Sequence, residues 1–401
     1  MYLFFSRPFL AIVASCIAFS GAADAQTHPS LRQAVDAAWA LSPQARALQN
    51  RQAELDARDR AASSLISGPP SVTLSHRTDR VGSNGGRREY EVELAAPLWA
   101  PGVRGATADQ ARADRTALER QLVLARSKVA AEVQELAAQF ASAQIEQQVA
   151  TRKLEEARTL AADIERRVKA GDAARVDLLL AQSTVNQAAA TLALADSALN
   201  RVQGQWRPLT GMNSFATLDD LVGAPQEHPA LAAGNAQLRA AQAKLALTAA
   251  DRRDPMEVGV GMTRERSAFG AASETSLRLS LRVPLGSDNR NAPKLAAARA
   301  EVDTAQAELD AAQRQVDAER QATQNELDAA RRTEAFAAER ARLSSEAQTL
   351  IAKSYRLGES DLPTRLRADN ERFDAELAHA KASAETRHAI AKLNQALGIL
   401  P

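Results

Sequence analysis

The sequence predicts a mainly α-helical fold with a small β part, in which one unit of helix, two strands, very long helix and medium helix occurs twice. Aromatic residues make up only 4% of the 401 residues, which is few for an ordinary globular core. Neither proline nor glycine interrupts the chain between Gly105 and Val168. Landmark residues also recur at a fixed offset. Together these features favour long helices in close contact.

When the chain is aligned with itself at an offset of 186 or 187 residues, similar landmarks coincide. Pro43 aligns with Pro229, Pro97-Leu98 with Pro284-Leu285, and Gly171 with Gly358. A duplication explains several landmarks in one order. We therefore divide the chain into a signal peptide (1–25), a first repeat (26–212), a linker (213–227) and a second repeat (228–401).

Each repeat contains the same predicted elements. A helix over 31–66 should stop at a Gly-Pro-Pro sequence that begins at Gly68. Strands are expected at 71–80 and 88–97, and again at 256–265 and 275–284. The uninterrupted stretch 105–168 predicts a helix about 95 Å long. Apolar residues recur every seven positions along both long helices, which is typical of coiled-coil packing. We expect the shorter helices to stack end to end beside the long ones.

The predicted strands alternate between apolar and charged residues, so each should have one apolar face. The apolar positions are Tyr90, Val92, Leu94, Leu277, Leu279 and Leu281, and the charged positions are Glu89, Glu91, Glu93, Arg278 and Arg282. One such hairpin could be a solvated surface element. Two hairpins at matching places, with strands of about ten residues, fit tilted membrane strands. We then expect the apolar positions to face lipid and the charged positions to line a wet lumen.

One protomer cannot close such a barrel, because four strands leave two open edges and closure needs about eight strands or more. An open edge in lipid would leave backbone groups unsatisfied at several kcal/mol each. The sequence therefore predicts a homo-oligomer that shares its strands.

The first 25 residues resemble an export signal, with an apolar run and an Ala-Asp-Ala site ending at Ala25. Cys16 is the only cysteine, and Val13-Ala14-Ser15-Cys16 could instead be read as a lipobox that leaves Cys16 acylated. Both readings take the mature chain out of the cytoplasm.

The sequence gives no support to an enzyme, a cofactor site or a metal site. It lacks the phosphate-binding, zinc-protease and serine-hydrolase motifs, and its five histidines are scattered. Lys plus Arg number 50 against 49 for Asp plus Glu, so no overall basic charge points to nucleic acid.

Over essentially the whole mature chain, the sequence resembles the TolC family of outer-membrane efflux proteins. The matching features are the opening Leu31-Arg32-Gln33-Ala34-Val35 with Ala40-Leu41-Ser42-Pro43, the hairpins closing on Pro97-Leu98 and Pro284-Leu285, and the turns at Gly171 and Gly358 with Asp177-Leu178-Leu179 after the first. Each motif is short, and their order, spacing and duplication carry the resemblance.

The resemblance implies a homotrimer with a twelve-stranded β-barrel continued by a coiled-coil α-helical barrel. It also implies passive export, a periplasmic adaptor protein, an inner-membrane RND-type pump and contact with outer-membrane lipid. The stretch Pro284-Leu285-Gly286-Ser287-Asp288-Asn289-Arg290-Asn291 is similar to the heavy-metal branch related to CzcC. A drug or type I secretion duct is the alternative within the family.

The resemblance further implies a periplasmic gate at the helix-turn-helix tips. The candidate tip residues are Gly171, Asp172, Asp177, Tyr355, Gly358, Glu359 and Asp361. Thr364 and Arg367 stand where many members have aspartates, so the resemblance does not extend to an aspartate ring in the second repeat, and Glu359 or Asp361 could supply a different gate charge there. Asp172 and Asp361 could instead simply cap helices, and Tyr355 could be a packing aromatic.

Two alternatives come from other classes: an exported coiled-coil structural protein and a periplasmic adaptor. The first leaves the repeated alternating hairpins unexplained. The second expects one helical hairpin flanked by β-rich halves of small domains rather than duplication of the whole unit.

Overall fold

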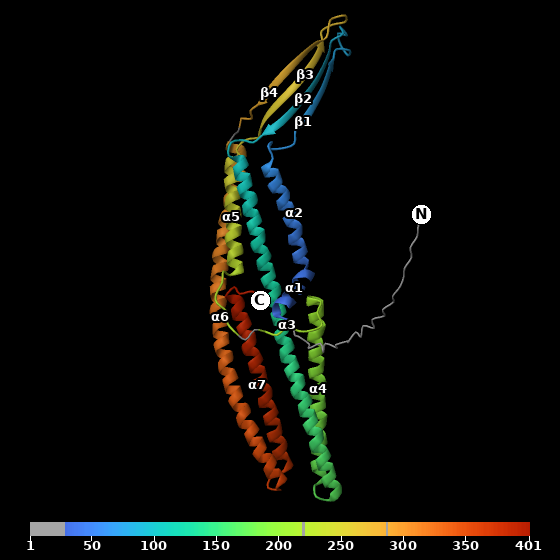
Figure 1. Ribbon diagram of the computed structural model, residues 1–401, viewed down its shortest axis with the longest axis vertical. Coiled ribbons are helices and arrows are strands. Elements are labelled where there is room, and N and C mark those ends of the chain that lie inside the picture. The colour runs from blue at the N-terminus through green and yellow to red at the C-terminus, as the bar shows by residue number, and fades with distance from the viewer. Residues whose placement is uncertain (1–28, 219–220, 286–287) are drawn as a thin grey trace, which may run out of the picture.

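The computed structural model describes residues 29–218, 221–285 and 288–401, although the side chains of 286–290 are not described. The signal peptide 1–25 and Cys16 lie outside these residues. So does part of the stretch from Pro284 to Asn291. The described chain is an elongated body with a sheet at one end and helices along the rest (Figure 1).

In the described part of the chain, seven helices and four strands follow one another in the order that the duplication predicts. They are α1 Leu31–Leu41, α2 Pro43–Ser63, β1 Ser71–Thr78, β2 Arg88–Leu98, α3 Val103–Ala170, α4 Arg175–Thr210, α5 Pro229–Ala250, β3 Met256–Arg266, β4 Glu274–Arg282, α6 Asp288–Arg356 and α7 Leu362–Ala396. The predicted strands and the first long helix are confirmed to within about two residues.

The first helix was predicted wrongly as one element over 31–66. It is broken at Ser42, which is extended with φ −64° and ψ 128° and separates α1 from α2. The residue before a proline is sterically disfavoured in the helical region, and Pro43 follows Ser42. Pro43 then occupies the first turn of α2, where its missing N–H costs nothing.

The helices form one curved layer. The long helices α3 and α6 run the whole height of this layer, α2 and α4 lie one above the other along α3, and α5 and α7 do the same along α6 (Figure 1). This confirms the predicted end-to-end stacking. The heptad positions Val129, Ala143, Ala150, Ala157 and Ile164 of α3 are buried, as coiled-coil packing requires.

None of the described helices combines the length and the apolar composition needed to cross a membrane.

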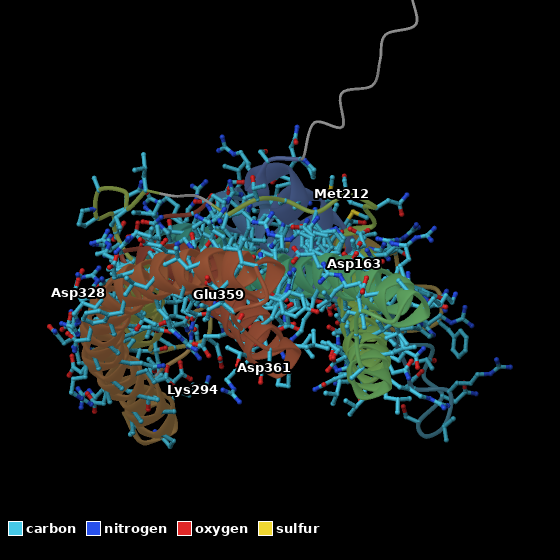
Figure 2. All side chains as sticks on the ribbon, turned by 90° about the horizontal axis from the view of Figure 1, so that it is seen from below. Asp163, Met212, Lys294, Asp328, Glu359 and Asp361 are labelled. Atoms are coloured by element: carbon cyan, nitrogen blue, oxygen red, sulfur yellow. The ribbon has the colours of Figure 1, made fainter. Side chains whose placement is uncertain are left out.

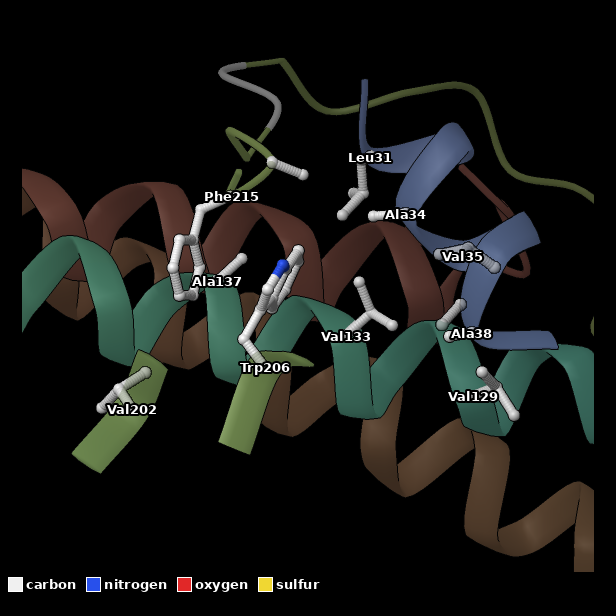
Figure 3. Close-up of a cluster of buried hydrophobic side chains, with 12 residues drawn as sticks. Leu31, Ala34, Val35, Ala38, Val129, Val133, Ala137, Val202, Trp206 and Phe215 are labelled. Carbon is white, nitrogen blue, oxygen red and sulfur yellow. The ribbon is translucent and has the colours of Figure 1, made fainter. Parts of the chain in front are cut away.

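The main apolar core lies where α1, α3 and α4 meet, near the middle of the layer (Figure 3). Trp206 of α4 is only 1% exposed and stacks on Phe215, with ring centroids 4.6 Å apart. Its indole Nε1 donates a hydrogen bond of 3.1 Å to the carbonyl of Ser214. The segment after α4 thus folds back and closes this core.

His228 caps the start of α5 in a way that should make the stability of the protein depend on pH. Its Nδ1 accepts a 3.2 Å hydrogen bond from the N–H of Ala230, which caps the helix, and only neutral imidazole can accept there. Burial lowers the pKa of His228 from its ordinary 6.5, with Glu319 opposing this shift. The native state therefore disfavours protonation, and its stability falls as pH drops from about 6.5 toward the lowered native value.

We expect wild-type protein to lose more thermal stability between pH 8 and pH 5.5 than the variant His228→Ser, whose hydroxyl caps without titrating. Circular dichroism melting at both pH values measures the difference. Equal losses in the two proteins would show that His228 does not contribute.

Candidate functional site

The four strands form one antiparallel sheet in the order β1-β2-β3-β4. The strand register aligns the apolar positions of all four strands on one face: Val72 lies opposite Leu94, Leu94 opposite Val260, and Val260 opposite Leu279. The next row continues through Leu74, Val92, Met262 and Leu277. The strands thus share one continuous apolar face.

No other element of the described chain packs against this apolar face. Leu277 and Leu279 are 82% and 78% exposed, and Tyr90, Val92, Leu94 and Leu281 are exposed as well. A water-facing sheet normally has the opposite pattern, with its polar face outward. The six predicted lipid-facing residues are therefore brought together on one exposed face.

The opposite face carries the charged positions, and cross-strand partners neutralise most of them. Glu91 forms an ion pair with Arg278, and Glu93 accepts a 2.6 Å hydrogen bond from Ser280 Oγ. Arg278 is the repeat equivalent of Glu91, so the two copies have acquired opposite charges at one position.

Two further predicted positions on this face are also paired. Arg282 lies 3.5 Å from Glu257, and Glu89 lies 3.8 Å from Arg77. Sequence reasoning placed Ser280 on this polar face but missed Glu257 and Arg77. Only the register, in which Arg77 faces Glu89 and Glu257 faces Arg282, could identify them.

The far end of the helical layer is made of two helix-turn-helix tips. Gly171 ends α3 and Gly358 follows α6, both with positive φ (89° and 78°), a conformation that glycine adopts without strain. The N–H of Asp172 donates 2.8 Å to the carbonyl of Arg167, and the N–H of Glu359 donates 3.0 Å to that of Ser354. These bonds close both helix ends.

Asp361 caps α7, as the simpler of the two interpretations expects. Its Oδ1 accepts a 3.0 Å hydrogen bond from the N–H of Thr364. Hydrogen bonds from the side chain and the backbone of Thr364 hold the pKa of Asp361 below its usual range. Asp172 is exposed in the other turn, and Asp177 lies half-buried in the first turn of α4. Figure 2, seen from this end, places Glu359 and Asp361 near the centre of the helical arc.

Tyr355 joins the two tips. Its ring lies between the guanidinium groups of Arg167 and Arg365, 5.6 Å and 5.3 Å from the ring centroid. It also packs against a buried cluster in which Ile164 of α3 and Leu362 of α7 meet. Arg167 and Arg365 were missed from the sequence, because only the packing of α3 against α7 brings them to the tyrosine.

Above the tips, polar contacts continue between α3 and α7. Glu156 forms an ion pair with Arg372 at 2.5 Å, and Glu135 lies 3.1 Å from Nε2 of His388. The α3–α4 and α6–α7 helical hairpins of one protomer are thus joined along their length.

Comparison with known proteins gives one family. Residues 222–399 match the family described as outer membrane efflux protein. Protein CyaE of Bordetella pertussis is 30% identical over 314 residues, which cover 70% of this chain. The match covers 65% of that relative, so the chain spans slightly less than two thirds of its length.

Solved structures share the fold. The outer membrane protein VceC from Vibrio cholerae gives a TM-score of 0.71 at 16% identity, with 92% of this chain and 96% of that chain covered. A membrane protein from Pseudomonas aeruginosa gives 0.70 at 21% identity, with 98% and 97% covered. The fold is that of outer-membrane channel proteins. The second repeat matches the outer membrane efflux protein family over residues 222–399, and this match together with the fold points to a protein of the outer membrane that extends into the periplasm.

Proposed function

We propose that this chain is one protomer of the outer-membrane duct of a tripartite efflux system. The observation that carries the proposal is the four-stranded sheet, with one apolar exposed face, one charged face and two open edges. This face can lie in lipid only if neighbouring copies pair with both open edges of the sheet, because unpaired backbone groups are costly in lipid. Three copies would supply twelve strands around a polar lumen, within the range of known membrane barrels.

Exposed apolar residues on the two flanks of the helical arc support the same assembly. On α6 and directly after its end, Phe336, Leu343, Leu350 and Leu357 repeat every seven residues and are exposed, Phe336 by 76%. On α4, Val176, Leu179, Leu180 and Leu194 are exposed. Because α6 and α4 lie at opposite ends of the arc (Figure 2), contact between them in neighbouring copies would be head to tail, and such contacts generate a ring when the rotation between copies closes.

A homotrimer of this kind conducts passively, and we propose that a periplasmic adaptor and an inner-membrane RND-type pump deliver its substrate. Heavy-metal cations are the candidate cargo suggested by the resemblance over residues 284–291. Among the described residues, no cluster of three or more His, Cys, Asp or Glu side chains could hold a metal ion. Drug export and type I secretion are the alternative cargo classes. The exposed apolar sheet face favours a duct over an exported coiled-coil structural protein.

The tip residues Tyr355 and Asp177 are the proposed gate. We expect the double variant Tyr355→Phe with Asp177→Ala to raise single-channel conductance in a planar bilayer several-fold. The reason is that both changes remove polar groups from the tips, where Tyr355 connects the α3–α4 hairpin to the α6–α7 hairpin.

The variant Asp196→Ala is the matched control, because it removes a carboxylate from α4 well above the tip. Its conductance should equal that of wild type. If the double variant also conducts like wild type, the gate lies elsewhere. If wild-type protein forms no conducting pores in any condition, the duct itself is refuted.

A further inference from the structure

The exposed apolar face of the sheet changes character toward the hairpin loops. Beyond the rows of Val, Leu and Met, the next row on this face holds His76, Tyr90 and Arg264. The rings of His76 and Tyr90 stack, with centroids 4.4 Å apart. The row after that pairs Arg88 with Arg266. Along one face, the order is therefore apolar, aromatic, cationic.

Carboxylates are segregated onto the opposite face at this height. The row between Tyr90 and Arg88 contains Glu89, Glu265 and Glu274, with Arg77 beside them, and alternation turns all four side chains toward the charged face. Within the described part of the chain, Arg88, Arg264 and Arg266 form no ion pair with a carboxylate. Arg88 and Arg264 are exposed. Three positive charges on this face thus lack a protein counter-charge.

The two hairpin loops hold Arg266 in place. Its Nε donates a 3.3 Å hydrogen bond to the carbonyl of Gly86, and its guanidinium lies 5.8 Å from the ring centroid of Phe269. The N–H of Phe269 in turn donates 3.0 Å to the carbonyl of Gly85. Gly86 has a φ of 88°, and a Cβ there would overlap Phe269. Contacts between the two hairpin loops therefore hold Arg266, at one end of the cationic row, in position.

The height of this row matches a membrane boundary. From Leu98 to Arg88 is ten residues, which at about 3.4 Å each and a tilt of about 45° span roughly 24 Å. The apolar band of an outer-membrane barrel is about 25 Å tall and has aromatic girdles at its edges. Tyr90 then lies at the edge of the hydrocarbon, and Arg88 lies at the level of the lipid headgroups.

We propose that Arg88, Arg264 and Arg266 form a binding site for the phosphate groups of anionic lipid in the outer leaflet. The inference rests on the proposed lipid-facing role of the apolar sheet face. One molecule with acyl chains below and a phosphate above complements the observed order of apolar, aromatic and cationic rows. Guanidinium groups bind phosphate through paired, charge-assisted hydrogen bonds. Bound lipid would fix the height and tilt of the sheet in the membrane.

The test uses the full-length protein extracted in detergent, with bound lipid counted by native mass spectrometry. Wild type should retain lipid A carrying both phosphates in preference to lipid A stripped of phosphate. The double variant Arg88→Gln with Arg264→Gln should bind phosphorylated lipid A about 25-fold more weakly, since each basic residue near an anionic surface contributes about fivefold.

Arg77→Gln is the height-matched control, because Arg77 lies on the opposite face and its loss should leave lipid binding unchanged. An excess of inorganic phosphate should compete only weakly if the lipid is the ligand, and full competition would overturn the lipid assignment. Equal binding of the two lipid A forms, or equal losses for Arg77→Gln and the double variant, would overturn the site.

Conductance in a planar bilayer separates this inference from the proposed function. The double variant should conduct like wild type, because its arginines face away from the lumen. Wild-type pores without a preference for phosphorylated lipid would refute the site alone. The absence of pores in wild type would refute both.

Discussion

The variant Leu279→Arg should fail to accumulate as an assembled membrane protein. Leu279 is 78% exposed in the middle of the apolar sheet face, between Val260 on β3 and the open edge of β4. If that face meets lipid, an arginine there costs about 2–4 kcal/mol near the bilayer midplane. Three protomers would multiply this penalty. Heat-modifiable migration and outer-membrane fractionation measure the assembled protein.

The adjacent residue provides the control. Ser280 lies on the charged face, where its hydroxyl donates a hydrogen bond to Glu93. Ser280→Arg adds the same side chain one position along the same strand, beside a carboxylate, and should assemble at close to the wild-type level. If both variants assemble equally well, the apolar face does not meet lipid. If only Ser280→Arg fails, the two faces are assigned the wrong way round.

The variant Trp206→Ala should cause the largest loss of stability in the helical layer, about 3–5 kcal/mol as for other buried large aromatic residues. Trp206 stacks on Phe215, and its indole N–H is satisfied by the carbonyl of Ser214. Truncation leaves a cavity and releases the segment that closes the core. Thermal melting followed by circular dichroism should show a markedly lower midpoint.

Two further variants separate the causes of this loss. Trp206→Phe keeps an aromatic ring against Phe215 and loses the hydrogen bond, so its loss should be clearly smaller. Leu221→Ala changes a side chain that is 81% exposed and should melt like wild type. A wild-type melting midpoint for Trp206→Ala would mean that this core does not determine stability.

Much of the fold follows from local patterns in the sequence. Period-two alternation around Tyr90 and Leu279 defines the strands and their faces, because each side chain must point opposite to its neighbour. Seven-residue spacing around Ile164 predicts the buried seam of α3. Gly171 and Gly358 predict the tips, because a positive φ at a helix end favours glycine.

The features that the sequence analysis missed depend on contacts between distant segments. The ion pair of Glu91 with Arg278 requires the β2–β3–β4 register, and that of Glu156 with Arg372 requires α3 to pack on α7. The break at Ser42 was missed although Pro43 marks it, because the helical pattern continues on both sides. The tip residues Arg167 and Arg365 carry no local signal that would distinguish them from other surface arginines.

If this chain is one third of a closed duct, its assembly in detergent should show it. Native mass spectrometry of detergent-extracted protein, combined with negative-stain imaging of the same sample, gives the number of copies and the shape of the assembly. We expect a homotrimer more than about 100 Å long, because α3 alone has 68 residues at about 1.5 Å each, with a central channel. A water-soluble rod without a channel, released without detergent, would contradict the account and leave a coiled-coil scaffold in its place.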